Sequence, residues 1–283
     1  MTIYVSGDFT IDWGDGTAIE YINKTTTTAT TYIPNYTANG DYQVKWRGKA
    51  TGYNAANQSL IFGTNNWTIV GIDGSIGKIF STLPNGTNPS FEKLFENANN
   101  MTSQIPENLF DGITGKPVPN MFSSTFYNCY GMVGEIPAGL FAGLDGPPTE
   151  NIFANTFYYC SKLSGKIPDN LFAGIKGKPA ENMFYNTFGN CYNLGGTISP
   201  NLFSGINGAP APAMYRSTFS GCKELSGVIS EQLFSGIQGA PAEGMFWETF
   251  SNCKSLTGQI PSNLFSGISG TPAVNMFHGT FQS

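Results

Sequence analysis

The feature that most constrains this chain is a unit of 31 residues that recurs without insertion or deletion. Each copy contains an isoleucine followed by Pro or Ser, and these isoleucines are Ile105, Ile136, Ile167, Ile198, Ile229 and Ile260. Self-similarity at a fixed period is typical of proteins built from stacked structural copies. Because one copy cannot bury its apolar side chains alone, the sequence predicts a molecule in which each copy packs on the next.

Several positions of the copy hardly vary, and they define structural columns along the stack. The columns are Phe at 110, 141, 172, 203, 234 and 265, Gly at 112, 143, 174, 205, 236 and 267, Pro at 117, 148, 179, 210, 241 and 272, Phe after Thr at 126, 157, 188, 219, 250 and 281, and Cys at 129, 160, 191, 222 and 253. In a stack, equivalent positions of neighbouring copies lie beside one another. We therefore expect ladders of Phe, Thr and Cys.

The second half of each copy has the spacing of a short helix. In the third copy, Pro179 suits the first helical turn, because its missing N–H would have no partner there. Phe184, Phe188 and Cys191 then follow at i, i+4 and i+7, which is one apolar face of a helix. The sequence therefore predicts a helix after the Pro of each copy.

The first half of each copy has a different pattern. Alternation over Leu163–Ile167 predicts a short strand whose Gly allows a neighbour to approach closely, and Pro168 blocks its extension. A further helical turn around Phe172 is expected to end at Gly174 and Gly177. The predicted fold class is an α/β repeat solenoid of 31-residue strand–turn–helix units, preceded by a small all-β segment.

The order of the columns also resembles a known family. In most copies Cys follows Phe by three residues and Leu follows Cys by three more, leading into the Ile-Pro strand. This spacing resembles the BspA-type leucine-rich repeat proteins of microbial surfaces, over roughly residues 74–283. The resemblance implies a leucine-rich-repeat-like solenoid and a role in adhesion or recognition.

The chain divides into three predicted parts. These are a β-rich segment over 1–54, a bridging segment with a degenerate N-terminal capping repeat over 55–104, and six copies over 105–283, the last incomplete. The capping repeat carries Ala98 in the Cys column and Leu94 in place of Thr, and terminal repeats are usually atypical. The last copy ends at Ser283 before its Cys, so we expect an uncapped edge that could pair with a partner chain.

The N-terminal segment has the alternation of β structure. Phe9–Trp13 and Tyr42–Trp46 alternate, Gly14–Gly16 supplies a tight hairpin turn, and Gly48 follows the second run. The sequence FTIDWGDGT with a later GDYQVKWRG resembles a PKD-type immunoglobulin-like module without its opening strands. We expect a compact β piece docked on the capping repeat, with residues 55–73 as the bridge.

Composition and motifs argue against several chemistries. The net charge is −5 with 12% charged residues, which does not suit a nucleic-acid binder, and no apolar run approaches the roughly 20 residues that span a bilayer.

Cysteines in one register fit disulfide geometry poorly and lack zinc-like spacing. Asp12 and Asp15 could bind Ca²⁺, but the Asp-Gly turn explains them more simply. His278, the only histidine, has no nucleophile in a suitable context, so we expect no cofactor, metal or enzymatic activity.

Two positions of the copy vary and favour aromatic or basic residues. They run Ser123, Ala154, Tyr185, Arg216, Trp247, His278 after one Phe column and Tyr130, Ser161, Tyr192, Lys223, Lys254 after the Cys column, with Tyr127, Tyr158 and Tyr159 nearby. Such residue types are enriched at binding hot spots. The candidate ligand-binding residues are therefore Tyr130, Tyr158, Tyr159, Tyr185, Tyr192, Arg216, Lys223, Trp247, Lys254 and His278. The alternative is a tolerant solvated face.

Two classes of function follow from these features. The first is a non-catalytic adhesion or recognition module that binds a protein or glycan through the repeat face at a microbial surface. The second is a structural self-assembling subunit of a filament, a surface layer or a phage virion or tail, which uses the uncapped edge and another copy of itself as partner. Either function places the chain outside the cell, on its surface or in a virion, although no signal peptide is visible at its start.

Overall fold

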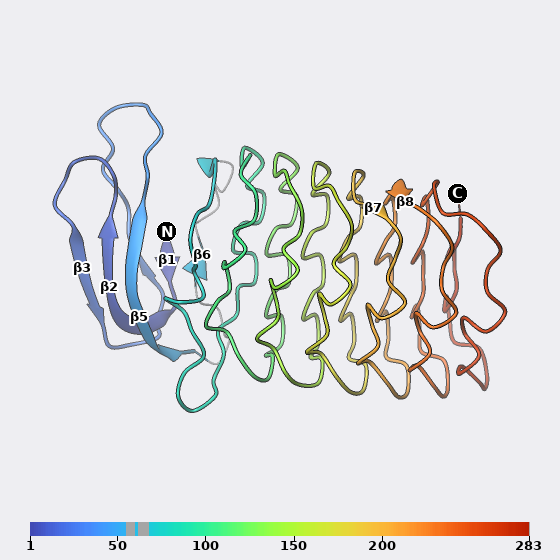
Figure 1. Ribbon diagram of the computed structural model, residues 1–283. Coiled ribbons are helices and arrows are strands. Elements are labelled where there is room, and N and C mark those ends of the chain that lie inside the picture. The colour runs from blue at the N-terminus through green and yellow to red at the C-terminus, as the bar shows by residue number, and fades with distance from the viewer. Residues whose placement is uncertain (55–59, 62–67, 283) are drawn as a thin grey trace.

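The computed structural model describes residues 1–54, 60–61 and 68–282 of the chain. A β-rich N-terminal segment lies at one end, and the copies follow side by side along one axis, so that the two ends of the chain lie far apart (Figure 1). The bridge expected over 55–73 lies partly outside the described residues, as does the expected end of the last copy at Ser283.

Two small sheets form the N-terminal segment. Their strands are β1 (Thr2–Ile3), β2 (Val5–Asp12), β3 (Glu20–Lys24), β4 (Thr30–Thr31), β5 (Lys45–Tyr53) and β6 (Leu60–Ile61). One antiparallel sheet has the order β3-β2-β5 and the other the order β4-β1-β6. The predicted alternation of β2 is confirmed, because Phe9, Ile11 and the following Trp13 are all buried.

The second predicted strand of this segment was misplaced. It was expected over Tyr42–Trp46 and before Gly48, but β5 begins at Lys45 and runs through Gly48. Gly48 has a φ of 131°, and a Cβ built on it would overlap the carbonyl oxygen of Asp8 on β2. Glycine is therefore needed inside β5, because it lets the two strands approach each other.

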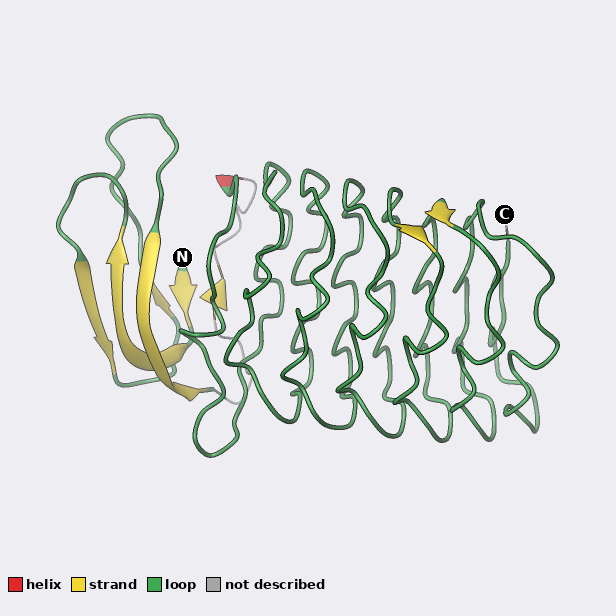
Figure 2. Ribbon diagram, in the orientation of Figure 1, coloured by secondary structure: helices red, strands yellow, loops and turns green. Residues whose placement is uncertain are grey.

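The predicted fold class, an α/β leucine-rich-repeat solenoid with a helix in every unit, is wrong. The described residues contain no α-helix, and in the copies the strands are limited to β7 (Gly195–Gly196) and β8 (Glu224–Leu225), as Figure 2 shows. The segment expected to be helical in the third copy, residues 180–191, consists instead of overlapping turns. We call this segment and its equivalents in the other copies the turn ladder.

Backbone hydrogen bonds in the turn ladder alternate between two directions. The N–H groups of Met183, Tyr185 and Thr187 donate to the carbonyl three residues earlier, which closes a local turn. The N–H groups between them donate to the next copy, as Phe184 does to Met214 at 3.0 Å. An α-helix would direct every N–H to the carbonyl four residues earlier. Half of the N–H groups here hold neighbouring copies together.

Asparagine at every fourth position explains why the turn ladder is not a helix. In the third copy Asn182, Asn186 and Asn190 have φ values of 52°, 52° and 59°. Positive φ at the third residue of a turn is the hallmark of type II turns, and Asn tolerates it better than most residues. All the non-glycine residues with positive φ in the described part of the chain occupy these three columns. The four-residue spacing of Phe184 and Phe188 belongs to this turn period.

Two further ladders connect the copies. The predicted strand over Leu163–Ile167 is reduced to single parallel bridges, such as Lys166↔Gly195, and to the β7–β8 pair. A second row of bridges passes through the glycines after the first Phe column, such as Gly177↔Ile206. Gly174, expected to end a helical turn, instead allows close approach, because a Cβ on it would overlap the carbonyl oxygen of Leu144.

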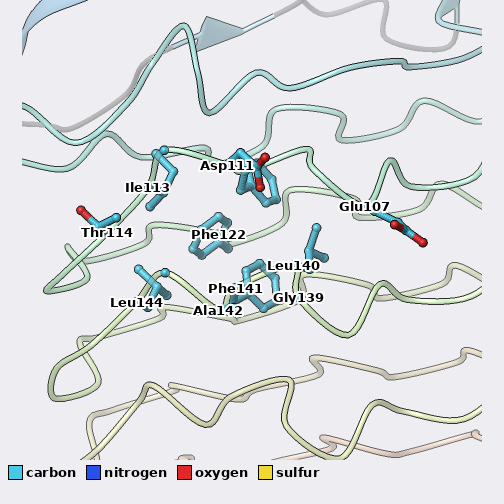
Figure 3. A pocket seen from close by; sticks show the side chains of 13 residues that line it. Glu107, Asp111, Ile113, Thr114, Phe122, Gly139, Leu140, Phe141, Ala142 and Leu144 are labelled. Carbon is cyan, nitrogen blue, oxygen red and sulfur yellow. The ribbon is translucent and has the colours of Figure 1, made fainter.

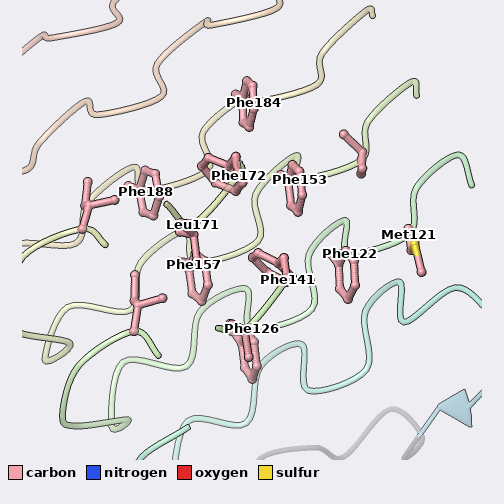
Figure 4. Close-up of a cluster of buried hydrophobic side chains, with 14 of the residues drawn as sticks. Met121, Phe122, Phe126, Phe141, Phe153, Phe157, Leu171, Phe172, Phe184 and Phe188 are labelled. Atoms are coloured by element: carbon pink, nitrogen blue, oxygen red, sulfur yellow. The ribbon is translucent and has the colours of Figure 1, made fainter. Parts of the chain in front are cut away.

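The expected Phe ladders form the core (Figure 4). Along one column the rings of Phe122, Phe153 and Phe184 stack with centroids 5.8 and 5.6 Å apart. A second column passes through Phe157 and Phe188, whose ring centroids are 5.7 Å apart. Stacked rings of this kind contribute beyond the area that they bury. Each copy thus closes the apolar face of the copy before it.

The Thr and Cys columns satisfy backbone carbonyls inside this core. Thr187 Oγ1 donates to the Phe153 carbonyl at 3.0 Å, and Cys191 Sγ donates to the Phe157 carbonyl at 2.9 Å. The same two contacts recur in neighbouring copies, as for Thr156 and Cys160. All five cysteines are buried and free. Their column has a structural role, because a buried carbonyl accepts each thiol.

Candidate functional site

The turn ladder places side chains in the core and on the surface with a period of four residues. Phe184 and Phe188 are fully buried, whereas Tyr185 between them is half-buried on the outer face. The variable residues of successive copies therefore lie one beside another along the stack. We call this set the aromatic strip, and it consists of Tyr127, Tyr158, Tyr159, Tyr185, Tyr192, Arg216, Lys223, Trp247 and His278.

One line of the aromatic strip is centred on Arg216. Its guanidinium carbon lies 3.9 Å from the ring centroid of Trp247 and 5.5 Å from that of Tyr185. Trp247 in turn meets His278 edge-on, with ring centroids 5.1 Å apart. Stacking on both neighbours holds the guanidinium in place, with each cation–π contact worth about 0.5–1 kcal/mol at an exposed site. Four successive copies thus contribute one continuous row.

The second line of the aromatic strip is mainly phenolic. Tyr127 and Tyr158 stack with ring centroids 5.2 Å apart, and Tyr159 contacts both Tyr158 and Tyr192 at 5.7 Å. Lys223 then places its ammonium nitrogen 4.3 Å from the Tyr192 ring centroid. A hydrogen bond with Tyr159, together with burial, raises the pKa of Tyr192 to about 12. The hydroxyl group of Tyr192 therefore stays protonated and uncharged at neutral pH.

Two donor groups of the strip lack acceptors. Arg216 Nε and Trp247 Nε1 are buried and have no hydrogen-bond partner among the described residues. Arg216, Lys223 and Lys254 also take no part in the ion pairs of the described part, which join Lys78 to Asp111, Lys166 to Asp169 and Lys176 to Asp145. The strip therefore carries cations and N–H groups that the fold itself leaves uncompensated.

The structure does not bring all of the predicted site residues together. Tyr130 and Lys254 are exposed, and no ring or cation contact joins either of them to the strip within the residues that the structure describes. Ser123 and Ala154, the first members of the variable column, are buried. The strip is therefore richest in large side chains from the second copy onward.

One glycine that shapes the strip was not predicted as part of the site. Gly189 occupies the column of Tyr127 and Tyr158, and a Cβ on it would lie 2.9 Å from the Tyr158 ring. The missing side chain lets the Tyr158 ring lie over the third copy. The available signal was a Gly in a column that holds Tyr in the two preceding copies.

Other candidate chemistries have simpler structural roles. Asp12 accepts a hydrogen bond from the Gly14 N–H at 2.9 Å, and Asp15 accepts one from the Thr17 N–H at 3.0 Å, so both shape the hairpin turn. Within the described ranges, no group of three or more His, Cys, Asp or Glu residues is placed to hold a metal ion. A cavity of about 170 Å³ between the first two copies is lined by core residues such as Phe122 and Phe141 and by exposed residues such as Glu107 and Asp111 (Figure 3).

No family model, curated protein or solved structure matches this chain. None of the described segments forms a helix of the length and apolar character needed to cross a membrane.

Proposed function

We propose that this chain is a non-catalytic recognition module that binds its ligand through the aromatic strip. The observation that carries the proposal is the Tyr185–Arg216–Trp247–His278 row, in which four successive copies supply side chains that contact each other and also face outward. Aromatic and Arg side chains of this kind supply most of the energy at binding sites.

Rigidity supports a binding role for the strip. The backbone under it is fixed by hydrogen bonds to both neighbouring copies, such as Asn186 to Arg216 and Ser217 to Trp247. Side chains that are already ordered before binding lose little entropy on contact with a ligand. The strip is thus a pre-organised surface, and its variability between copies allows a ligand to be recognised by side chains at fixed spacing.

We further propose that the module acts at a microbial surface or on a virion. The ground for this location is the Phe, Cys and Leu spacing, which resembles that of BspA-type surface proteins in sequence, although the fold is not the leucine-rich-repeat fold that the resemblance implied.

The test is a binding screen with a matched pair of proteins. Wild-type chain and the Arg216→Ala/Trp247→Ala double variant are applied to arrays of glycans and extracellular proteins. The expected result is one group of wild-type ligands whose signal falls by about tenfold or more in the double variant, because two hot-spot side chains are removed. If the double variant retains every interaction of the wild type, the strip is not the recognition surface and the proposal fails.

A second candidate function is self-assembly. Each described copy donates a row of backbone N–H groups to the next, as Gly244 does to Val274 and Phe246 to Met276, so the same unit of another chain could pair with the stack in the same way. Such a row is a template for pairing with another chain. Light scattering of the full chain separates the two functions, because assembly gives a mass that rises with concentration and is unchanged in the Arg216→Ala/Trp247→Ala variant.

A further inference from the structure

We infer that the ligand of the aromatic strip is an acidic linear polysaccharide, such as a polymer of uronic acids; this inference rests on the proposed recognition function. Three properties of the strip lead to this class. They are unpaired cations, donors without acceptors, and phenol rings arranged along one axis.

The cations of the strip call for an anionic partner. In the fourth copy, the guanidinium of Arg216 lies over the Trp247 ring and the ammonium of Lys223 lies over the Tyr192 ring. Neither cation has a carboxylate within ion-pair distance in the described part of the chain. Exposed Lys254 follows one copy later at the position equivalent to Lys223. A guanidinium held over a ring is fixed in position before binding, which suits hydrogen bonding to a carboxylate.

The unsatisfied donors call for an acceptor-rich partner. Arg216 Nε and Trp247 Nε1 are neighbouring groups that can only donate, and both are without a partner. Buried donors are rarely left in this state, because each costs about 1–3 kcal/mol. Both atoms are covered by neighbouring protein groups, so the oxygen of a ligand reaches them only when the side chains of the row shift on binding; carboxylates and sugar ring oxygens are suitable acceptors.

The phenolic line favours a sugar chain over a peptide or a nucleic acid. Tyr127, Tyr158, Tyr159 and Tyr192 contact one another through their rings and carry hydroxyl groups, so the line combines apolar ring carbon with hydroxyls, which suits the C–H groups and hydroxyls of a sugar. The rings recur along the axis of the stack, and a polymer with a short repeat can contact them in succession. The net charge of −5 and the 12% share of charged residues disfavour a partner as densely charged as nucleic acid.

The experiment measures binding of the full chain to immobilised polygalacturonate, to neutral dextran and to a single-stranded oligothymidylate. We expect binding to polygalacturonate alone, and we expect it to weaken as NaCl is raised from about 50 mM to about 500 mM, because salt screens exposed charges. The Arg216→Ala/Lys223→Ala variant should lose about tenfold or more in affinity. The matched control is Lys178→Ala, which removes an exposed cation that is not part of the strip. Unchanged denaturation midpoints show that the variants fold.

Equal binding to dextran, binding to oligothymidylate, or no binding to any of the three overturns the inference. These outcomes leave the recognition function standing if the array screen finds another ligand that depends on Arg216 and Trp247. Polygalacturonate binding that is unaffected in the Arg216→Ala/Lys223→Ala variant also overturns it, because the acidic glycan would then be bound elsewhere.

Discussion

The side-chain hydroxyl of Thr187 donates a hydrogen bond of 3.0 Å to the backbone carbonyl of Phe153, 34 residues earlier in the chain. The same carbonyl also accepts the local turn bond from the Thr156 N–H. One buried oxygen therefore joins two copies, and equivalent bonds recur from Thr125 to Thr280. The Thr column thus acts as a second set of connections between copies, in addition to the backbone.

Removing this hydroxyl is expected to destabilise the stack. In Thr187→Val the shape of the side chain is kept, but the Phe153 carbonyl loses a buried bond, so we expect a loss of about 1 kcal/mol in the free energy of unfolding. Guanidinium denaturation followed by circular dichroism measures it. Thr187→Ser keeps the hydroxyl and is the control. Equal midpoints for Thr187→Val and the wild type would show that the bond contributes nothing.

Substitution of Asn186 distinguishes the turn ladder from a helix. Asn186 has positive φ, so Asn186→Ala should lose about 1 kcal/mol, while Asn186→Gly should be neutral or stabilising. In a helix the order is reversed, because Gly is about 1 kcal/mol less favourable than Ala. The denaturation midpoints show which of the two variants is more stable. A higher midpoint for Asn186→Ala than for Asn186→Gly would contradict the turn ladder.

Tyr215 occupies a Phe position at a cost. Its ring stacks between Phe184 and Phe246 at 5.6 Å on both sides, but its hydroxyl is buried without a partner. Tyr215→Phe removes that unsatisfied group, and we expect a gain of about 1–3 kcal/mol in the free energy of unfolding. The reciprocal Phe184→Tyr should lose stability. A fall in the thermal midpoint of Tyr215→Phe would mean that the hydroxyl has a partner.

The buried thiols make stability depend on pH in the alkaline range. Burial raises the pKa of Cys129 and of Cys253 to about 12, from an ordinary value of 9.0. Between these two pKa values the unfolded chain releases thiol protons that the folded chain retains. The free energy of unfolding therefore keeps its full value below pH about 9 and falls as the pH rises toward about 12. Each thiol contributes up to about 1.4 kcal/mol per pH unit in this window.

The measurement is the denaturation midpoint from pH about 8 to about 11 for the wild type and Cys160→Ala, since one fewer thiol then titrates. Burial also raises the pKa of Cys160, so the variant should show a shallower decline. Tyrosines that titrate in the same range are common to both proteins and cancel in the comparison. Identical pH slopes would show that the Cys160 thiol ionises equally in the folded and unfolded chain.

The sequence predicted the period, the columns and the buried faces of this fold, but not its local backbone. Phe184, Phe188 and Cys191 fit a helix and a turn ladder equally well, because both place residues four apart on one side. The distinguishing residues were Asn182, Asn186 and Asn190, which favour positive φ and are poor in helices. The close approach at Gly174 was hidden as well, because the contact is with the backbone of another copy.

The candidate site was predictable in part for a related reason. Variation within a repeated column pointed to Tyr185, Arg216 and Trp247, because structural positions such as Phe184 repeat and these do not. Their mutual contacts depend on how far one copy lies from the next, which the sequence does not state. Tyr130 is likewise an aromatic residue in a variable column, but it is exposed and lies apart from the strip.

The alternating bonds of the turn ladder also give the stack an electric polarity. Five N–H groups per copy, at Asn182, Phe184, Asn186, Phe188 and Asn190, all donate toward the following copy. In the glycine bridges, by contrast, Lys176 and Gly177 donate in opposite directions and cancel. Aligned peptide dipoles add, as they do in an α-helix, but here the positive pole lies toward the later copies. Other N–H groups, such as that of Gly195, donate to the preceding copy and offset part of this polarity. The backbone therefore gives the two ends of the stack partial charges of opposite sign, which add to those of their side chains.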